Sequence, residues 1–429
     1  MNSSLPGVTL LDLQLAVNCT LDEATLLMPT NAAGFMVGAL ICGVIIEFID
    51  FQIVLLISTV ACSATTAYFP LNRKFWILCL NSSVNGFLTG FMISGGNAWL
   101  LHLWGKASPP FLQAFHFCFG LGAFIGPLVA EPFLLPLHHE EIEIHVNSSH
   151  LNSSLHLNSS FPYTSDDLKI QYAYGSLSLA SLIIAAAFLA AYCAQRTNKP
   201  HPSIDEMKSD CKQKPISAVK YYGSVMLCCF FMFFNYGLEL SFGQLLTAFV
   251  VDSNLKLSKS KASFMTSVYW GAFTFFRCFT IFLVDKFTST KLIIFNLSLI
   301  GIANVFLVPF GCRIEWCLWV GVTLVGFGTS PLFATIFSFL GEYMKITSKV
   351  SSLLFVACYA GAFVMPYVVG VTVETHPDVF LYQSALCAVS LCLVFFGLFF
   401  IKRAQLLDKC EEENNNVELR NKHIADAQP

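Results

Sequence analysis

One feature recurs along almost the whole sequence: apolar stretches of about twenty residues, separated by short polar segments. About 20 apolar residues in a helix cross the hydrocarbon of a bilayer, and a helix satisfies its own backbone hydrogen bonds there. The stretches are too long and too little alternated for strands. We predict eleven spanning helices, at residues 31–49, 51–69, 75–101, 111–136, 170–194, 221–250, 264–284, 291–310, 316–340, 350–373 and 379–401. The chain is thus predicted to be an all-α polytopic membrane protein.

Composition excludes several other classes of protein. The 429 residues are 55% hydrophobic and only 12% charged, which is too much apolar surface for one soluble core. A net charge of −3, with no basic stripe, argues against a nucleic-acid partner. The sequence offers no nucleophile beside a base, no phosphate-binding loop and no array of metal ligands. We therefore expect neither an enzyme nor a bound cofactor.

The two long polar segments predict an orientation in the membrane. Residues 195–220 carry six lysines and arginines, which by the positive-inside rule predicts a cytoplasmic linker. Residues 137–169 carry one basic residue and three Asn-x-Ser acceptor sites for glycosylation. These sites are Asn147, Asn152 and Asn158. Because one span separates the two segments, the 137–169 loop is predicted to be extracellular.

Counting the predicted spans outward from these two segments gives the sides on which the ends of the chain lie. Residues 1–30 form a predicted extracellular segment, with Asn18 in a further glycosylation site. Residues 403–429 form a predicted cytoplasmic tail. We expect its polar part, which opens at Glu411–Asn416, to lack a fixed structure.

An internal repeat divides the chain into two halves. Gly122-Ala-Phe-Ile-Gly-Pro-Leu-Val in the fourth span matches Gly361-Ala-Phe-Val-Met-Pro-Tyr-Val in the tenth. One span earlier in each half, Gly86-Phe-Leu-Thr matches Gly326-Phe-Gly-Thr. The pattern predicts parallel repeats with equivalent spans six apart.

The two halves differ in their number of spans. Residues 31–194 hold five spans and residues 221–402 hold six, so the sixth span has no partner. We therefore infer that the N-terminal half lacks the first helix of its repeat. Either the chain is a truncated product or its N-terminus is divergent.

Two parallel helical halves joined by a cytoplasmic linker resemble the major facilitator superfamily, whose substrates bind near the midplane. A finer resemblance is to the sodium-dependent glucose transporter 1 and major facilitator superfamily domain-containing protein 4 family. It rests on Gly95-Gly-Asn, Leu103-Trp-Gly, Gln113-Ala-Phe-His-Phe with Gly120-Leu-Gly-Ala-Phe, Gly237-Leu-Glu with Phe242-Gly, and Trp270-Gly with Arg277. The resemblance implies a secondary carrier working by alternating access, with sodium-coupled uptake of a hexose at the plasma membrane. It also implies that Leu10-Leu-Asp-Leu ends a first helix.

Polar side chains within the apolar spans are candidates for a translocation site, because a buried ionised group is costly in a bilayer. Asn235 and Glu239 lie four residues apart on one helix face, with Gln244 further round. Glu239 has the alternative of pairing with another helix purely for packing. Arg277 lies within the seventh span and is a further candidate.

Three further polar groups lie on two neighbouring spans. Gln113 and His116 share a face of the fourth span, and Asn97 lies on the span before it. His116 is equally consistent with a structural hydrogen bond and with handling a proton. Trp270 is equally consistent with stacking on a sugar ring and with filling a helix interface.

Gating residues are expected near the cytoplasmic face. Gly43 and Glu47, followed by Asp50, form a degraded version of the superfamily's motif, without its basic residues. In the second half, Arg277 is followed by Asp285 and Lys286, which either form access-dependent salt bridges or only mark a helix end.

Two other functions remain open from the sequence. One is a non-transporting membrane sensor or a truncated isoform, which the missing first helix suggests. The other is a carrier of a different small solute coupled to protons, for which His116 and Glu239 are suitable groups.

Overall fold

The computed structural model describes residues 4–46, 48–104, 109–135, 167–194, 217–284, 286–344, 348–373 and 375–426. The helices of the N-terminal half are α1 (Leu5–Val8), α2 (Leu10–Val17), α3 (Leu21–Thr25), α4 (Leu27–Ile45), α5 (Phe51–Tyr68), α6 (Phe75–Trp104), α7 (Pro109–Ala130) and α9 (Ile170–Ala194). Two short 3-10 helices, η1 (Phe69–Leu71) and η3 (Glu131–Phe133), follow α5 and α7.

The C-terminal half contains the longest helices. They are α10 (Ala218–Asp252), α11 (Lys259–Val284), α12 (Ser289–Phe310), α13 (Glu315–Thr329), α14 (Leu332–Gly341), α15 (Ser348–Gly370) and α16 (Asp378–Asp426).

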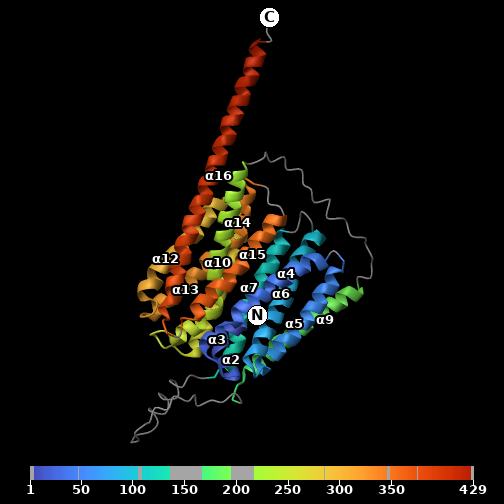
Figure 1. The fold of residues 1–429 in the computed structure, drawn as a ribbon, viewed down its shortest axis with the longest axis vertical. Coiled ribbons are helices and arrows are strands. Elements are labelled where there is room, and N and C mark those ends of the chain that lie inside the picture. Colours follow the sequence, from blue (N-terminus) through green and yellow to red (C-terminus); the bar gives the residue numbers. More distant parts are fainter. Residues whose placement is uncertain are drawn as a thin grey trace.

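The two halves form neighbouring helical bundles (Figure 1). Within the halves, α4 packs on α6 and α10 packs on α15. Between the halves, α7 packs on α11 and α4 packs on α15. In the sequence repeat, α4 is equivalent to α11 and α7 is equivalent to α15. The α7–α11 contact in one position of the interface is therefore matched by an equivalent contact, α15–α4, in the other. This is the arrangement that parallel repeats predict.

Two glycines of the repeat allow equivalent helices to approach closely. A Cβ atom added to Gly86 of α6 would lie 2.0 Å from the carbonyl oxygen of Asn31 in α4. A Cβ atom added to Gly326 of α13 would lie 2.7 Å from the carbonyl oxygen of Tyr269 in α11. Small residues at such crossings allow backbones to touch in a membrane. The matched motifs therefore hold the same pair of helices together in each half.

Most of the predicted spans are helices of the expected length. Ten helical segments in the described part of the chain are long and apolar enough to cross a bilayer. Helix α11, expected as the span at 264–284, is not among them; its bounds include Lys259, Lys261 and Arg277. Helix α4 begins at Leu27 and ends at Ile45, earlier in the sequence than the predicted span at 31–49.

The span predicted at 316–340 is broken into α13 and α14. The two helices meet at Ser330 and Pro331. Proline has no N–H to donate to the carbonyl four residues earlier, and its ring crowds that carbonyl. A hydrogen bond to α11 stabilises the break: the Ser330 hydroxyl donates to the carbonyl oxygen of Phe273 in α11 at 2.6 Å. The irregular backbone is thus enclosed by protein, as it must be within a membrane.

The N-terminal segment forms short, buried helices. Leu5, Leu10 and Leu13 are each at most 1% exposed, and α1 packs against α10. A capping box between Thr20 and Glu23 begins α3. Helices α1 and α2 are too short to span, whereas α3 and α4 together form one candidate span, Leu21–Ile45. This span begins inside residues 1–30, which the sequence predicted to lie wholly outside the membrane. The residues that the family resemblance assigns to the end of a first helix lie in α2.

Asn18 ends α2 in the left-handed conformation, with φ of 51°, and its side chain is exposed. Its glycosylation stays a prediction. The other three candidate sites, Asn147, Asn152 and Asn158, lie outside the described residues.

Helix α16 continues well beyond the predicted span and extends away from the bundles to Asp426 (Figure 1). The expectation that the tail lacks a fixed structure is wrong for this part of it. The helix is attached where it leaves the bundle: Lys402 pairs with Glu342, and the Gln405 amide donates to the Tyr343 carbonyl at 2.9 Å. Local helix-forming residues and this attachment outweigh the polarity of the tail.

Candidate functional site

A cavity lies between the two halves. Helices α6 and α7 line it from the N-terminal half, and α10, α11, α14 and α15 line it from the C-terminal half. Its lining residues are Ile93, Asn97, His116, Phe119, Tyr236, Glu239, Arg277, Phe333, Phe355, Cys358 and Tyr359. Four of the eight predicted translocation residues, one on each of α6, α7, α10 and α11, thus meet in one place.

The cavity is small in this structure. Its volume is about 60 Å³, whereas pockets that hold small ligands measure about 300–1,000 Å³. A solute with several polar groups would need the lining helices to move apart. The cavity as it stands in this structure is therefore too small for such a solute.

Glu239 and Arg277 bring opposite charges to the cavity from adjacent helices. Glu239 is 2% exposed, and its Oε2 atom has no hydrogen-bond partner among the described residues. The Arg277 guanidinium donates from Nη2 to the Ser330 carbonyl at 2.8 Å and lies 4.4 Å from the centre of the Phe273 ring. Because Ser330 is at the break between α13 and α14, the broken helix fixes the position of the arginine. No ion pair joins Arg277 to Glu239 within the described part of the chain, so both groups can still bind a solute.

His116 and Asn97 add polar groups from the N-terminal half. His116 is half-buried, and its ring lies 6.4 Å from that of Phe333 in the opposite half. The Asn97 amide donates to the carbonyl of Ile93 at 2.8 Å, which leaves the amide oxygen for another partner. Gln113 lies one turn before His116 on α7.

Two tyrosines that the sequence reasoning missed also face the cavity. The hydroxyl of Tyr236 donates to that of Tyr359 at 3.3 Å. The Tyr359 ring stacks on Phe35 of α4 with 3.8 Å between ring centres, which joins the two halves. A tyrosine hydroxyl is polar on an otherwise apolar side chain, and this property is the only sequence signal that could have singled them out.

Of the other four predicted translocation residues, three do not line the cavity, and the side chain of Gln113 lies outside the described part of the structure. Asn235 is fully buried on α10, and neither of its side-chain polar atoms has a partner among the residues described. The backbone of Gln244 packs against Gly7 of α1. Trp270 is fully buried behind Phe119, which does line the cavity, with their rings edge to face at 6.2 Å. The expected helix face of α10 is therefore rotated, so that Tyr236 rather than Asn235 accompanies Glu239.

The gating candidates that the structure describes, Gly43, Asp50 and Lys286, are not among the residues that line the cavity. Gly43 is in the last turn of α4, with no other side chain close to it. Asp50 caps α5 by accepting a hydrogen bond from the Gln52 N–H at 2.8 Å, and Lys286 is exposed. Glu47 and Asp285 lie outside the described residues. A gating role for these residues stays a prediction.

Comparison with known proteins agrees with this architecture. Residues 1–366 match the family model described as Major Facilitator Superfamily. The chain is similar to sodium-dependent glucose transporter 1A of Mus musculus, at 28% identity over 92% of this chain and 92% of that protein. It is also similar to sodium-dependent glucose transporter 1 of Homo sapiens, at 26% identity over 97% of this chain and 80% of that protein.

A solved structure shares the fold. It is the inward-facing, occupied form of a bacterial homologue of the human lysosomal transporter Spinster, with a TM-score of 0.63 and 12% identity. The match covers 95% of this chain and 94% of the bacterial one. These relatives are transporters rather than enzymes. With two helical bundles, a cavity between them and a family match over most of its length, the chain belongs to the major facilitator superfamily.

Proposed function

We propose that this chain is a secondary carrier that takes up glucose or a related hexose together with sodium, by alternating access. The observation that carries the proposal is the cavity between the halves, to which each half contributes polar side chains. Hydroxyl groups both donate and accept hydrogen bonds. A hexose can therefore donate to Glu239 and accept from Arg277, and the cavity tyrosines and phenylalanines can pack on its ring.

The relatives support the choice of substrate and of coupling ion, since two of them are named as sodium-dependent glucose transporters. Oxygen atoms are the ligands that hard cations prefer, and the Glu239 carboxylate and the Asn97 amide oxygen supply two in the cavity. We place the carrier in the plasma membrane, with the 137–169 loop outside and the linker and tail in the cytoplasm.

Uptake of labelled glucose tests the proposal. Cells or proteoliposomes holding the full chain should show saturable uptake that rises with an inward sodium gradient. Glu239→Gln should reduce this uptake by about tenfold or more, because one lost interaction of about 1.4 kcal/mol changes an equilibrium tenfold. Glu315→Gln is the matched control: that carboxylate lies at the start of α13, outside the cavity lining, and uptake should stay within about twofold.

Proton coupling of another small solute is a second candidate function. It is favoured by His116 and Glu239, two titratable side chains on the cavity wall. In this case uptake would follow an inward proton gradient and ignore sodium. An absence of saturable uptake under either gradient would favour a non-transporting sensor.

A further inference from the structure

A buried ion pair joins the two halves at one end of the molecule. The Lys259 ammonium at the start of α11 lies 2.6 Å from Oδ1 of Asp12 in α2. The side chains are 10% and 1% exposed, respectively. The other carboxylate oxygen of Asp12 accepts a hydrogen bond from the Leu135 N–H at 3.2 Å. The pair is thus enclosed by the N-terminal half, although its cation belongs to the C-terminal half.

Two neighbouring contacts cross the same boundary. The Ser263 hydroxyl of α11 donates to the Pro127 carbonyl of α7 at 2.9 Å. The Ser260 hydroxyl donates to Oε1 of Glu131 in η3 at 2.5 Å. The first turns of α11 are therefore fastened to the end of α7 and to the N-terminal segment. Since Leu135 directly precedes the segment that begins at residue 136, this end carries the 136–166 loop.

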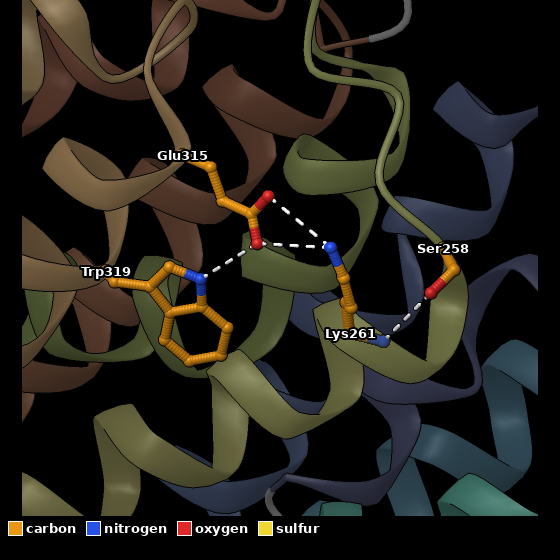
Figure 2. A network of polar contacts seen from close by, with 4 residues as sticks. All are labelled: Ser258, Lys261, Glu315 and Trp319. Carbon is orange, nitrogen blue, oxygen red and sulfur yellow. Dashed lines mark hydrogen bonds and ion pairs between the residues drawn. The ribbon is translucent and has the colours of Figure 1, made fainter.

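A second lysine on α11 makes a different kind of contact. Figure 2 shows Lys261, two residues after Lys259, reaching Glu315 of α13 at 3.3 and 3.4 Å. Glu315 also accepts from the Trp319 indole at 3.2 Å. This pair lies within the C-terminal half, and its side chains are 55% and 36% exposed. Lys259 thus bridges the halves at a buried site, whereas Lys261 pairs within its own half at an exposed site.

We propose that the Asp12–Lys259 pair is a latch that closes the cavity toward the side of the membrane carrying the 136–166 loop. The inference rests on the proposed alternating access, because opening toward that side requires α11 to separate from α7 and α2. When the halves are together, each charge is compensated by the other. When they separate, water hydrates both charges. A variant that removes one charge leaves the other buried without a partner only in the closed form, so its population should shift toward the open form.

Cys358 provides a direct measure of opening. Its free thiol lines the cavity and belongs to a residue that is 1% exposed in this structure. The experiment applies a membrane-impermeant thiol reagent to sealed vesicles from the side that carries the 136–166 loop, located by an epitope tag in that loop. Each variant is compared with the same variant carrying Cys358→Ser, which subtracts labelling of the other cysteines. We expect Lys259→Gln and Asp12→Asn each to increase the Cys358 labelling rate by about tenfold or more.

The matched control is Lys261→Gln, which removes the same type of charge two residues away and should leave the labelling rate unchanged. The double variant Asp12→Asn/Lys259→Gln has no unpaired charge and should label more slowly than either single variant. If one single variant does not reach the membrane, the double variant can still be compared with the other single variant. Unchanged labelling in the single variants, or an equal increase with Lys261→Gln, would overturn the latch. A double variant faster than both singles would also overturn it.

Labelling does not depend on sugar uptake, so the two proposals can fail separately. Faster labelling in a protein without uptake would remove the proposed function and leave the latch. Sodium-driven glucose uptake with unchanged labelling would remove the latch alone.

Discussion

Arg277 is held in place by two contacts. Its guanidinium donates to the Ser330 carbonyl and lies 4.4 Å from the centre of the Phe273 ring, within the range of a cation–π interaction. Arg277→Lys keeps the charge but loses the planar, forked donor. We expect solute uptake to fall roughly tenfold while the amount of protein in the membrane is unchanged, measured by uptake and surface labelling in parallel.

The control for this substitution is Arg313→Lys, because Arg313 is exposed between α12 and α13. Its uptake should match that of the unchanged protein. If Arg277→Lys also matched it, the charge alone would suffice, and the fixed position of the guanidinium would have no role.

Site residues were predictable where their chemistry stands out against an apolar span. Glu239, Arg277, His116 and Asn97 were predicted in this way, and all four line the cavity. Their role in translocation stays a prediction. Phe333, which also lines the cavity, was not predicted, because nothing distinguishes it among the 42 phenylalanines of the chain. The direction in which a helix face points also could not be predicted from the sequence. Spacing places two residues on one face of a helix, but only the packing of neighbouring helices decides where that face points.

The crossing of α10 and α15 depends on a glycine that belongs to the repeat. A Cβ atom added to Gly361 would lie 2.0 Å from the carbonyl oxygen of Phe233. Gly361→Ala must therefore push two helix backbones apart, at a cost of about 1–3 kcal/mol. We expect a lower melting temperature in detergent. Gly301→Ala on α12, where the added atom meets nothing within 4 Å, should melt no lower than the unchanged protein.

The elements were predictable to different degrees, for a physical reason. Hydropathy identifies a length of chain that prefers lipid, and it located the long helices well. Hydropathy does not detect a break in a helix when the residues at the break are themselves apolar or small. The division between α13 and α14 at Pro331 was therefore not predicted. Hydropathy also gives no signal for α1 and α2, which are too short to span and are stabilised by contacts with α10 and α11.

The orientation of the whole molecule can be tested through its glycans. If the 137–169 loop is extracellular, Asn147→Gln, Asn152→Gln and Asn158→Gln should each increase electrophoretic mobility by one step. Deglycosylation of the unchanged protein should match the triple variant. Asn81→Gln is the control: Asn81 is in an equivalent Asn-x-Ser motif but is 7% exposed within α6, and its amide donates to the Thr65 carbonyl. A shift with Asn81→Gln alone would contradict the predicted orientation.

The packing of the N-terminal segment has a consequence for biosynthesis. Thr9 meets the hydroxyl of Tyr174, 165 residues later, and Asp12 meets a lysine 247 residues later. These early residues leave the ribosome long before their partners are translated. Until α11 has been inserted, the carboxylate of Asp12 must remain hydrated at the membrane surface. Docking of the first helices is therefore a late step in assembly, and chains interrupted before α11 would expose them to the quality-control machinery.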